Sequence, residues 1–436
     1  MAEPPGASDA AGAAHAVGDR AAVPAAVRPA GTAGSVTVRE YGTRYLRISV
    51  RYHGEGRFSW LRVPGPAHDR PQTSPSPEVA AALRRAADTA FGARLALGEW
   101  ATGPGGERGG MVYRVPGAMS VARLLPSGDD TGYRLSVRAL TDMGRTLRQL
   151  HDVPWNFSAP APPHHGVRRL LTWIGGRDGA SDSPGSDLRE ADPRGRGLRD
   201  PRSPDQGSRR PGPQGADALG ADPAGSGSRD ADPRDPASRE RGRGRLGPPD
   251  RGPCDPGPGG QLWALARGRL GARLWERLGD WAEAARQPPG RGGVVLLHGA
   301  PSTGWLVPSP AGDHSVLLTG EEVTGGDPAL DLGWILGELH ELRSAATRGL
   351  GAAGQGPPVD YPAAARALLA GYLHTEESPE DLGPALPPGT ARAATLRLAV
   401  HMRDFASFVG WHEDLRHYAD LLAETLDADG EPTLHW

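Results

Sequence analysis

The first ordered part of the chain carries short runs in which apolar and polar residues alternate. Residues 45–52 (YLRISVRY) and residues 58–63 (FSWLRV) flank a Gly-containing turn, which predicts a β-hairpin. Residues 95–100 and 110–116 predict two further strands. The apolar positions of residues 78–90 (EVAAALRRAADTA) predict an amphipathic helix between the hairpin and those strands. A β-rich region with one helix therefore comes first.

Beyond residue 137 the spacing of apolar residues changes to three and four, which predicts helices. The predicted helices cover residues 137–151, 167–174, 262–281, 330–343, 363–373, 391–409 and 415–426. Two short apolar runs, residues 294–297 and 315–318, predict buried strands. The sequence thus predicts an α+β protein with a β-rich N-terminal part and a mostly helical C-terminal part.

Two segments lack any hydrophobic period. Residues 1–34 are rich in Ala, Gly and Pro, and residues 175–260 consist almost wholly of Gly, Pro, Asp, Arg and Ser. Neither segment has enough large apolar side chains to offset the entropy of ordering the chain. We predict a disordered tail and a disordered insertion. The insertion either binds a partner or is a solvated expansion without function.

Composition excludes several classes of function. The 436 residues have a net charge of −3, which gives no global field for nucleic acid or acidic membranes. The single cysteine, Cys254, cannot form an intramolecular disulfide and fits a reducing compartment. No apolar run approaches the roughly 20 residues that span a bilayer, and the N-terminus lacks the pattern of a signal peptide. We expect a cytoplasmic protein that binds neither nucleic acid nor membranes.

The chain contains no lysine, so all 49 basic residues are arginines. A GC-rich coding sequence favours Ala, Gly, Pro and Arg together and accounts for this bias without any functional cause. The consequence holds whatever the cause is. No strand of the protein can present a side-chain amine to a ligand.

Three motifs occur in a characteristic order. Residues 150–154 read Leu-His-Asp-Val-Pro, residues 298–305 read His-Gly-Ala-Pro-Ser-Thr-Gly-Trp, and residues 326–332 read Gly-Asp-Pro-Ala-Leu-Asp-Leu. They resemble the L-H-x-V-P, H-G-D-x-x-x-x-N and G-D-P-x-x-D-L motifs of the aminoglycoside phosphotransferase and choline kinase-like family. The resemblance covers residues 36–175 and 262–426.

This resemblance implies a bilobal, protein kinase-like fold. Residues 35–117 would form the small lobe. Residues 118–436 would form the helical large lobe, interrupted by the insertion at 175–260. In the family, a small-lobe lysine holds the nucleotide phosphates, and carboxylate and amide oxygens hold Mg²⁺.

The positions that carry the family's chemistry are altered here. Ala300 stands where the family has its catalytic Asp, and Trp305 stands where it has the metal-binding Asn. Thr319 replaces the Asp that opens D-x-E, although Glu321 retains the Glu of that motif. A catalytic base needs a carboxylate within hydrogen-bond reach of the nucleophile, and Ala300 has no polar side-chain atom. The missing lysine belongs to the same pattern of loss.

The scaffold positions are retained. The resemblance implies that His298 braces the loop by hydrogen bonding, that Asp327 caps a helix, and that Asp331 fixes the loop backbone. None of these roles implies turnover.

The small lobe has its own candidate binding residues. Arg62 occupies the expected lysine position, with Glu78 as a candidate ion-pair partner; alternatively, Arg62 is a surface charge on an edge strand. Residues 111–117, including Tyr113 and Val115, resemble the hinge whose backbone would meet an adenine base.

Two hypotheses follow. The first is a degenerate pseudokinase with a binding or regulatory role, whose partner is an unknown protein or small molecule. The second is an active small-molecule phosphotransferase that uses ATP and Mg²⁺ and has a rewired metal site at Glu321 or Glu322. No cofactor is assured under the first hypothesis. Under the first hypothesis, a purine site without catalysis remains open.

Overall fold

The computed structural model describes residues 35–68, 73–87, 92–101, 109–176, 257–287, 293–349, 359–375 and 385–436. The predicted disordered tail lies outside the described residues. So does the predicted insertion, apart from residues 175–176 and 257–260, and residues 257–260 already belong to a helix. Residue contacts divide the chain into one unit of residues 1–180 and 256–436 and another of residues 181–255. All elements below belong to the first unit.

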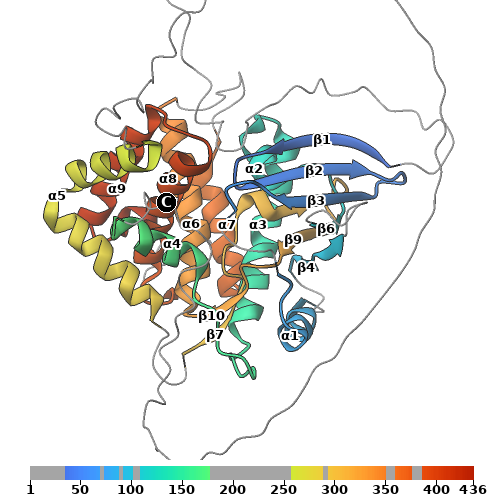
Figure 1. Ribbon diagram of the computed structural model, residues 1–436. Helices are drawn as coiled ribbons and strands as arrows, with labels where there is room; N and C mark the ends of the chain where they lie inside the picture. The colour runs from blue at the N-terminus through green and yellow to red at the C-terminus, as the bar shows by residue number, and fades with distance from the viewer. Residues whose placement is uncertain are drawn as a thin grey trace, which may run out of the picture. The chain divides into compact units, whose positions relative to one another are not determined.

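The N-terminal strands form a five-stranded sheet in the order β1-β2-β3-β6-β5. Its strands are β1 (Val36–Gly42), β2 (Leu46–Tyr52), β3 (Phe58–Pro64), β5 (Glu99–Ala101) and β6 (Gly110–Val115). All neighbouring strands are antiparallel. The predicted hairpin is confirmed as β2 and β3, with Tyr52 opposite Phe58. Figure 1 shows β1, β2 and β3 side by side.

The single strand predicted over residues 95–100 is wrong, because the chain changes sheets at Gly98. The residues before it form β4 (Arg94–Leu97), which pairs with a different sheet, and those after it form β5. A side chain at Gly98 would come within 2.7 Å of Met111 and 2.8 Å of Tyr113. Glycine therefore lets the backbone pass close to these two side chains of β6 without displacing them.

Two smaller sheets lie next to the motifs. β4 pairs in parallel with β9 (Ser315–Thr319), which pairs with β8 (Leu306–Pro308). β7 (Val295–Leu297) pairs with β10 (Thr324–Gly326) in an antiparallel ribbon. β7 and β9 confirm the two predicted buried strands, and each of them leads into a motif segment.

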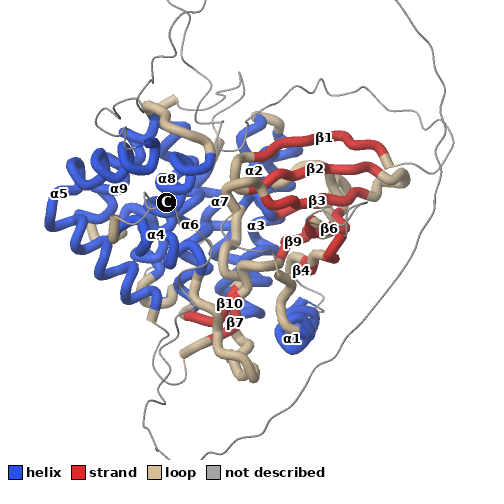
Figure 2. The backbone as a smooth tube through the Cα atoms, viewed as in Figure 1, coloured by secondary structure: helices blue, strands red, loops and turns tan. Residues whose placement is uncertain are grey.

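Most of the other described residues are helical. The α-helices are α1 (Pro77–Ala87), α2 (Val121–Leu124), α3 (Asp130–His151), α4 (His165–Ile174), α5 (Gly257–Arg286), α6 (Pro328–Thr347), α7 (Tyr361–Leu373), α8 (Thr390–Phe408) and α9 (Asp414–Asp427). Figure 2 shows the strands of the two larger sheets at one end of this unit and most helices at the other, with β7 and β10 at the lower middle. The predicted α+β class, with a β-sheet region first and a mostly helical part after it, is confirmed.

Helix α3 lies at the centre of the main core. It packs against α7 so closely that a side chain at Gly144 would meet the Leu368 carbonyl at 2.0 Å, and one at Gly371 would meet that of Thr141 at 2.1 Å. Leu140, Met143 and Leu147 on its buried face are fully inaccessible. Because glycines let the backbones touch, α3 and α7 form one rigid platform beneath the motif segments.

Helix ends follow local capping chemistry. α3 begins seven residues before the predicted start because the Asp129 side chain accepts a hydrogen bond from the Gly132 amide at 2.7 Å. α5 contains a break at Gly271, which has a φ of 65° and a ψ of 176°. No helix among the described residues is long and apolar enough to cross a membrane.

A buried ionic cluster joins α6, α8 and α9 around Glu341. His401 Nδ1 lies 2.5 Å from the Glu341 carboxylate, Arg397 lies 3.6 Å from it, and the Tyr418 hydroxyl donates to it at 2.8 Å. Burial raises the pKa of Glu341, but the charge and hydrogen bond of His401, with smaller effects of Arg397 and Tyr418, lower it to about 2. Next to it, burial and the charge of Arg343 lower the pKa of His340 to about 4.

These two groups predict loss of stability in acid. The unfolded chain binds a proton at His340 as the pH falls below about 6.5, whereas the folded protein resists protonation until about 4. Stability present above pH 6.5 is therefore lost toward pH 4, by about 3 kcal/mol for this residue. Glu341 adds a second loss between about pH 4.5 and 2. We expect His340→Phe to flatten the profile of unfolding free energy between pH 6.5 and 4.

The measurement is urea unfolding at a series of pH values. The matched control is His417→Phe, which removes an exposed histidine of α9. Parallel profiles for the wild type and His340→Phe would show that His340 is not buried in its neutral form.

Candidate functional site

The carboxylate of Asp331, in the first turn of α6, is the centre of the motif region. Its two oxygens accept hydrogen bonds from the backbone amides of His298 at 2.7 Å and Gly299 at 2.8 Å. Nε2 of His151 lies 3.3 Å away, and Nδ1 of that ring contacts the Tyr372 hydroxyl at 2.9 Å. Burial raises the pKa of Asp331, but the hydrogen bond and charge of His151 and smaller effects hold it below its ordinary value. The carboxylate is therefore an ionised clamp on the loop.

His298 and Gly299 fix the backbone of the loop after β7. The His298 ring lies 3.0 Å from the Leu318 carbonyl of β9, and burial lowers its pKa, so the ring is neutral. Gly299 has a φ of 88°, and a side chain there would lie 1.7 Å from the Glu322 carbonyl. Only glycine fits, because both the positive φ and the close approach exclude a Cβ atom.

Ala300 follows this clamp and contributes no polar side-chain atom. The next polar side chains, Ser302 and Thr303, donate their hydroxyls to the buried carboxylate of Glu338 at 3.1 and 2.6 Å. The Thr303 amide donates to the same group at 3.2 Å. Glu338 thus holds the loop in place, and its oxygens face the loop backbone and hydroxyls.

Trp305 meets Arg62 across the site. The Arg62 guanidinium lies 3.9 Å from the centroid of the Trp305 ring, which is cation–π geometry, and donates to the Tyr113 hydroxyl at 3.2 Å. Arg62 is only 6% exposed and sits on β3, between β2 and β6. The alternative that Arg62 is an edge-strand surface charge is wrong.

Glu321 faces two cationic or potentially cationic side chains. Its carboxylate lies 3.9 Å from the Arg62 guanidinium and 3.3 Å from the His68 ring. Nearby, Thr319 is fully buried at the end of β9. Within the described ranges, no group of three or more His, Cys, Asp or Glu side chains is arranged to hold a metal ion.

The expected pairing of Arg62 with Glu78 does not form. Glu78 lies at the start of α1, where its carboxylate accepts hydrogen bonds from the amide and hydroxyl of Ser158 at 3.1 and 2.9 Å. Those hydrogen bonds lower the pKa of Glu78. Glu78 does lie on the predicted helix, α1. The carboxylate beside Arg62 is instead that of Glu321, which follows β9.

The segment resembling a hinge is packed into the core of the sheet. Tyr113 is fully buried and Val115 is 6% exposed. The Trp60 indole donates to the Gly117 carbonyl at 3.2 Å, and a side chain at Gly117 would lie 2.7 Å from the Pro308 carbonyl. The side chains of Tyr113 and Val115 therefore belong to an apolar core shared by β6, β8 and β9.

From His68, which contacts Glu321, a stack of aromatic rings leads to the end of α8. Tyr45 stacks on His68 with centroids 4.4 Å apart and lies 4.6 Å from Phe408. The Arg44 amide donates to the Phe408 carbonyl at 3.2 Å. Sequence reasoning missed His68, Phe408 and Glu338 because no short motif contains them; their partners are hundreds of residues or several elements away.

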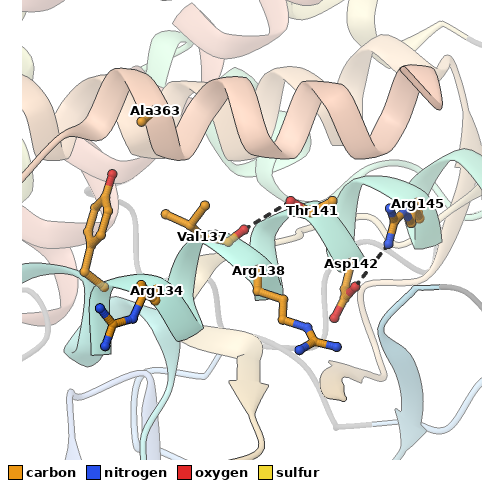
Figure 3. Close-up of a pocket in the computed structure, with 8 residues that line it drawn as sticks. Arg134, Val137, Arg138, Thr141, Asp142, Arg145 and Ala363 are labelled. Atoms are coloured by element: carbon orange, nitrogen blue, oxygen red, sulfur yellow. Dashed lines mark hydrogen bonds and ion pairs between the residues drawn. The ribbon is translucent and has the colours of Figure 1, made fainter. Parts of the chain in front are cut away.

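A separate hollow of about 550 Å³ lies along α3, beside Ala363 of α7. In Figure 3, Val137 points toward the helix that carries Ala363, whereas Arg134 and Arg138 extend from the other side of α3. Burial raises the pKa of Asp142, which accepts a hydrogen bond from Ser315 at 3.0 Å. The guanidinium groups do not converge on one point, so this hollow lacks a focused site.

We expect Asp331→Asn to destabilise the protein by about 2–4 kcal/mol. An asparagine amide keeps one acceptor oxygen but turns an NH₂ donor toward a backbone N–H, which leaves a buried donor unsatisfied. The measurement is the unfolding free energy in urea. The control is Asp327→Asn in the same helix, where Asp327 caps the Ala329 amide at 2.9 Å and asparagine caps equally well. Equal effects of the two substitutions would contradict the clamp.

No protein-family model and no curated protein matches the sequence. Solved structures that are similar include a choline/ethanolamine kinase family protein from Mesorhizobium loti, at 14% identity and TM-score 0.39 over 92% of each chain. A Plasmodium vivax ethanolamine kinase is similar at 9% identity and TM-score 0.45, over 90% of this chain and 82% of that one. A macrolide 2'-phosphotransferase from Brachybacterium faecium is similar at 15% identity and TM-score 0.34, over 89% of this chain and 91% of that one.

Proposed function

We propose that this chain is a catalytically degenerate relative of small-molecule phosphotransferases, with a binding or regulatory role instead of phosphate transfer. One observation carries the proposal. The residues at the expected lysine and asparagine positions, Arg62 and Trp305, are stacked on each other at 3.9 Å. In the family, these two positions would bind the nucleotide phosphates and the metal ion; here their side chains contact each other.

The stack opposes nucleotide entry for energetic reasons. A desolvated cation–π pair stabilises by about 2 kcal/mol, and a phosphate could reach the Arg62 guanidinium only after displacing the Trp305 ring. Arg62 also points to the Tyr113 hydroxyl and lies beside Glu321. A ligand would have to replace all three contacts before it gained any contact of its own.

The acid that lies beside Arg62, Glu321, is poorly placed to hold Mg²⁺. A metal at Glu321 would compete with Arg62 and His68 for the same carboxylate and would meet the positive charge of the guanidinium. Mg²⁺ also needs several oxygen ligands in a near-octahedral arrangement. At the other metal positions, Trp305 offers an indole and Thr319 a neutral hydroxyl, neither of which supplies a charged oxygen.

The proposal also accounts for the absence of a base at Ala300. Two carboxylates of α6 contact the loop on either side of Ala300, and both already accept hydrogen bonds: Asp331 from the amides of His298 and Gly299, and the buried Glu338 from Ser302 and Thr303. A substrate hydroxyl would need a free carboxylate within hydrogen-bond reach. The loop therefore keeps its shape while its side chains carry no catalytic group, which fits a scaffold that presents surfaces to a partner.

We expect no transfer of the ATP γ-phosphate to small hydroxylated acceptors or to water, even at stoichiometric protein with Mg²⁺, because the base and the metal oxygens are missing. The measurement is release or transfer of labelled phosphate. Turnover that disappears in Glu321→Ala and survives in Glu99→Ala would establish the active enzyme instead. Glu99 is an exposed carboxylate that pairs with Arg114 at 3.3 Å.

A second experiment, thermal unfolding with ATP, tests whether the protein binds nucleotide and whether binding needs Mg²⁺. A ligand at one hundred times its Kd would stabilise the protein by about 2.7 kcal/mol, which is readily seen in Tm. We expect no shift with or without Mg²⁺. A shift that requires Mg²⁺ would support the enzyme, and a shift without Mg²⁺ would show a nucleotide site and contradict closure of the cleft.

The closure itself predicts an energetic coupling between Arg62 and Trp305. In a double-mutant cycle with Arg62→Met and Trp305→Leu, we expect a coupling of about 1–2 kcal/mol in the unfolding free energy, because each substitution removes one half of the stack. The control pair is Arg267 and Trp263, an exposed arginine 4.8 Å from a ring, whose coupling should be smaller. A coupling of zero for Arg62 and Trp305 would remove the basis of the proposal.

A further inference from the structure

We propose that a second cavity, in the helical part and away from the Arg62–Trp305 stack, binds a small amphipathic anion: an organic acid with an apolar body. The cavity has a volume of about 550 Å³. This volume falls in the range of about 300–1,000 Å³ that is usual for small-ligand sites. The inference concerns different residues from those of the proposed function and does not depend on it.

Five segments that are distant in sequence enclose this cavity. They are the loop after α3 around residues 155–164, the C-terminal end of α5, strand β10, and the starts of α6 and α8. The ribbon of β7 and β10 separates it from the motif loop. Three residue pairs, from Gly326 opposite Val295 to Thr324 opposite Leu297, lie between the cavity end of this ribbon and His298. The ribbon spans about 10 Å, so the two sites are distinct.

The walls of the cavity are mainly apolar. Trp155, Trp281, Leu330 and Leu396 line it, and the last three are less than 9% exposed. The Trp155 indole already donates to the Ala159 carbonyl at 3.1 Å, so its ring offers a satisfied, apolar surface. Such walls favour a hydrocarbon or aromatic body, because burying it removes apolar area from water.

The charge at the cavity selects an anion. Arg392 of α8 is exposed, lines the cavity and lies 5.4 Å from the Trp281 ring. It has no carboxylate partner in the described part of the chain. Two other charged groups line the cavity and already have partners: Arg286 is paired with Glu283, and the Asp327 carboxylate, which keeps its negative charge, caps the Ala329 amide at the start of α6. One guanidinium therefore remains for a ligand, and it binds carboxylates with two parallel hydrogen bonds.

The start of α8 adds to this preference. Its N-cap is Gly389, which provides no side-chain cap, and the Thr390 hydroxyl turns back to the Pro387 carbonyl at 2.7 Å. The positive end of this 19-residue helix is therefore not neutralised by an acidic cap. His164 also lines the cavity, with its ring 4.5 Å from that of Trp334. A ligand whose carboxylate binds Arg392 and whose apolar part lies between Trp155 and Trp281 would contact these features.

Decanoate is a suitable probe, with decan-1-ol and decyltrimethylammonium as ligands of equal chain length and different charge. We expect saturable binding of decanoate by calorimetry, with a saturable change in tryptophan fluorescence, and weaker binding of the other two. Arg392→Gln should weaken decanoate about tenfold and leave decan-1-ol nearly unchanged. Ala284→Trp, a substitution at an exposed helix position on the cavity wall, should abolish binding of both.

The matched control is Arg267→Gln, which removes an arginine stacked on Trp263 outside the cavity and should leave decanoate binding intact. Circular dichroism and Tm verify that each variant is folded. The proposal is overturned by absence of saturable decanoate binding, by equal or tighter binding of decyltrimethylammonium, or by decanoate affinity that is unchanged in Arg392→Gln. Decanoate binding that persists in folded Ala284→Trp would place the ligand elsewhere and would also overturn it.

Discussion

The buried carboxylate of Asp331 is the interaction on which the motif region depends. It is fully inaccessible, yet it stays ionised because two backbone amides and the His151 ring surround it. A buried charge is costly unless it is paired and hydrogen-bonded, so the group only stabilises the fold when all partners are present. Through it, α6 holds the loop after β7, and α3 holds α6. The frame is therefore set by backbone and carboxylate contacts that do not involve the catalytic positions.

The contact between Arg62 and Trp305 depends on the chemical difference between arginine and lysine. A planar guanidinium can lie flat on an indole and still donate sideways, as Arg62 does to Tyr113 above Trp305. A compact ammonium can also form a cation–π contact and pair with Glu321, but it lacks the flat face with which a guanidinium covers the ring. The arginine-only composition and the tryptophan at position 305 thus reinforce each other. Trp305, in contact with Arg62, also packs against the apolar core of the N-terminal sheet.

Much of the fold was predictable from apolar periodicity, because long helices and the β2–β3 hairpin bury one regular face. β1, β8 and β10 were not predicted. β8 and β10 have three residues each, too few to show a period, whereas the equally short β7 was predicted from its continuous apolar run. The frame residues were recognisable because they occur in short motifs. The contacts that close the site were not: Arg62 and Trp305 are 243 positions apart, and Glu78 was an equally plausible partner for Arg62 by sequence. Only the tertiary structure decides between such partners.

The loop geometry has a consequence for how this chain can change by mutation. Gly299 touches the Glu322 carbonyl backbone to backbone, and Asp331 binds amides that every residue type except proline possesses. The backbone contacts at His298 and Gly299 therefore do not depend on the side chain at Ala300. Thr319 differs, because its side chain is fully buried and a larger residue there would disturb the packing around β9. A substitution at Ala300 leaves the contacts of Asp331 in place, whereas a substitution at Gly299 or Asp331 removes one of the contacts that shape the loop.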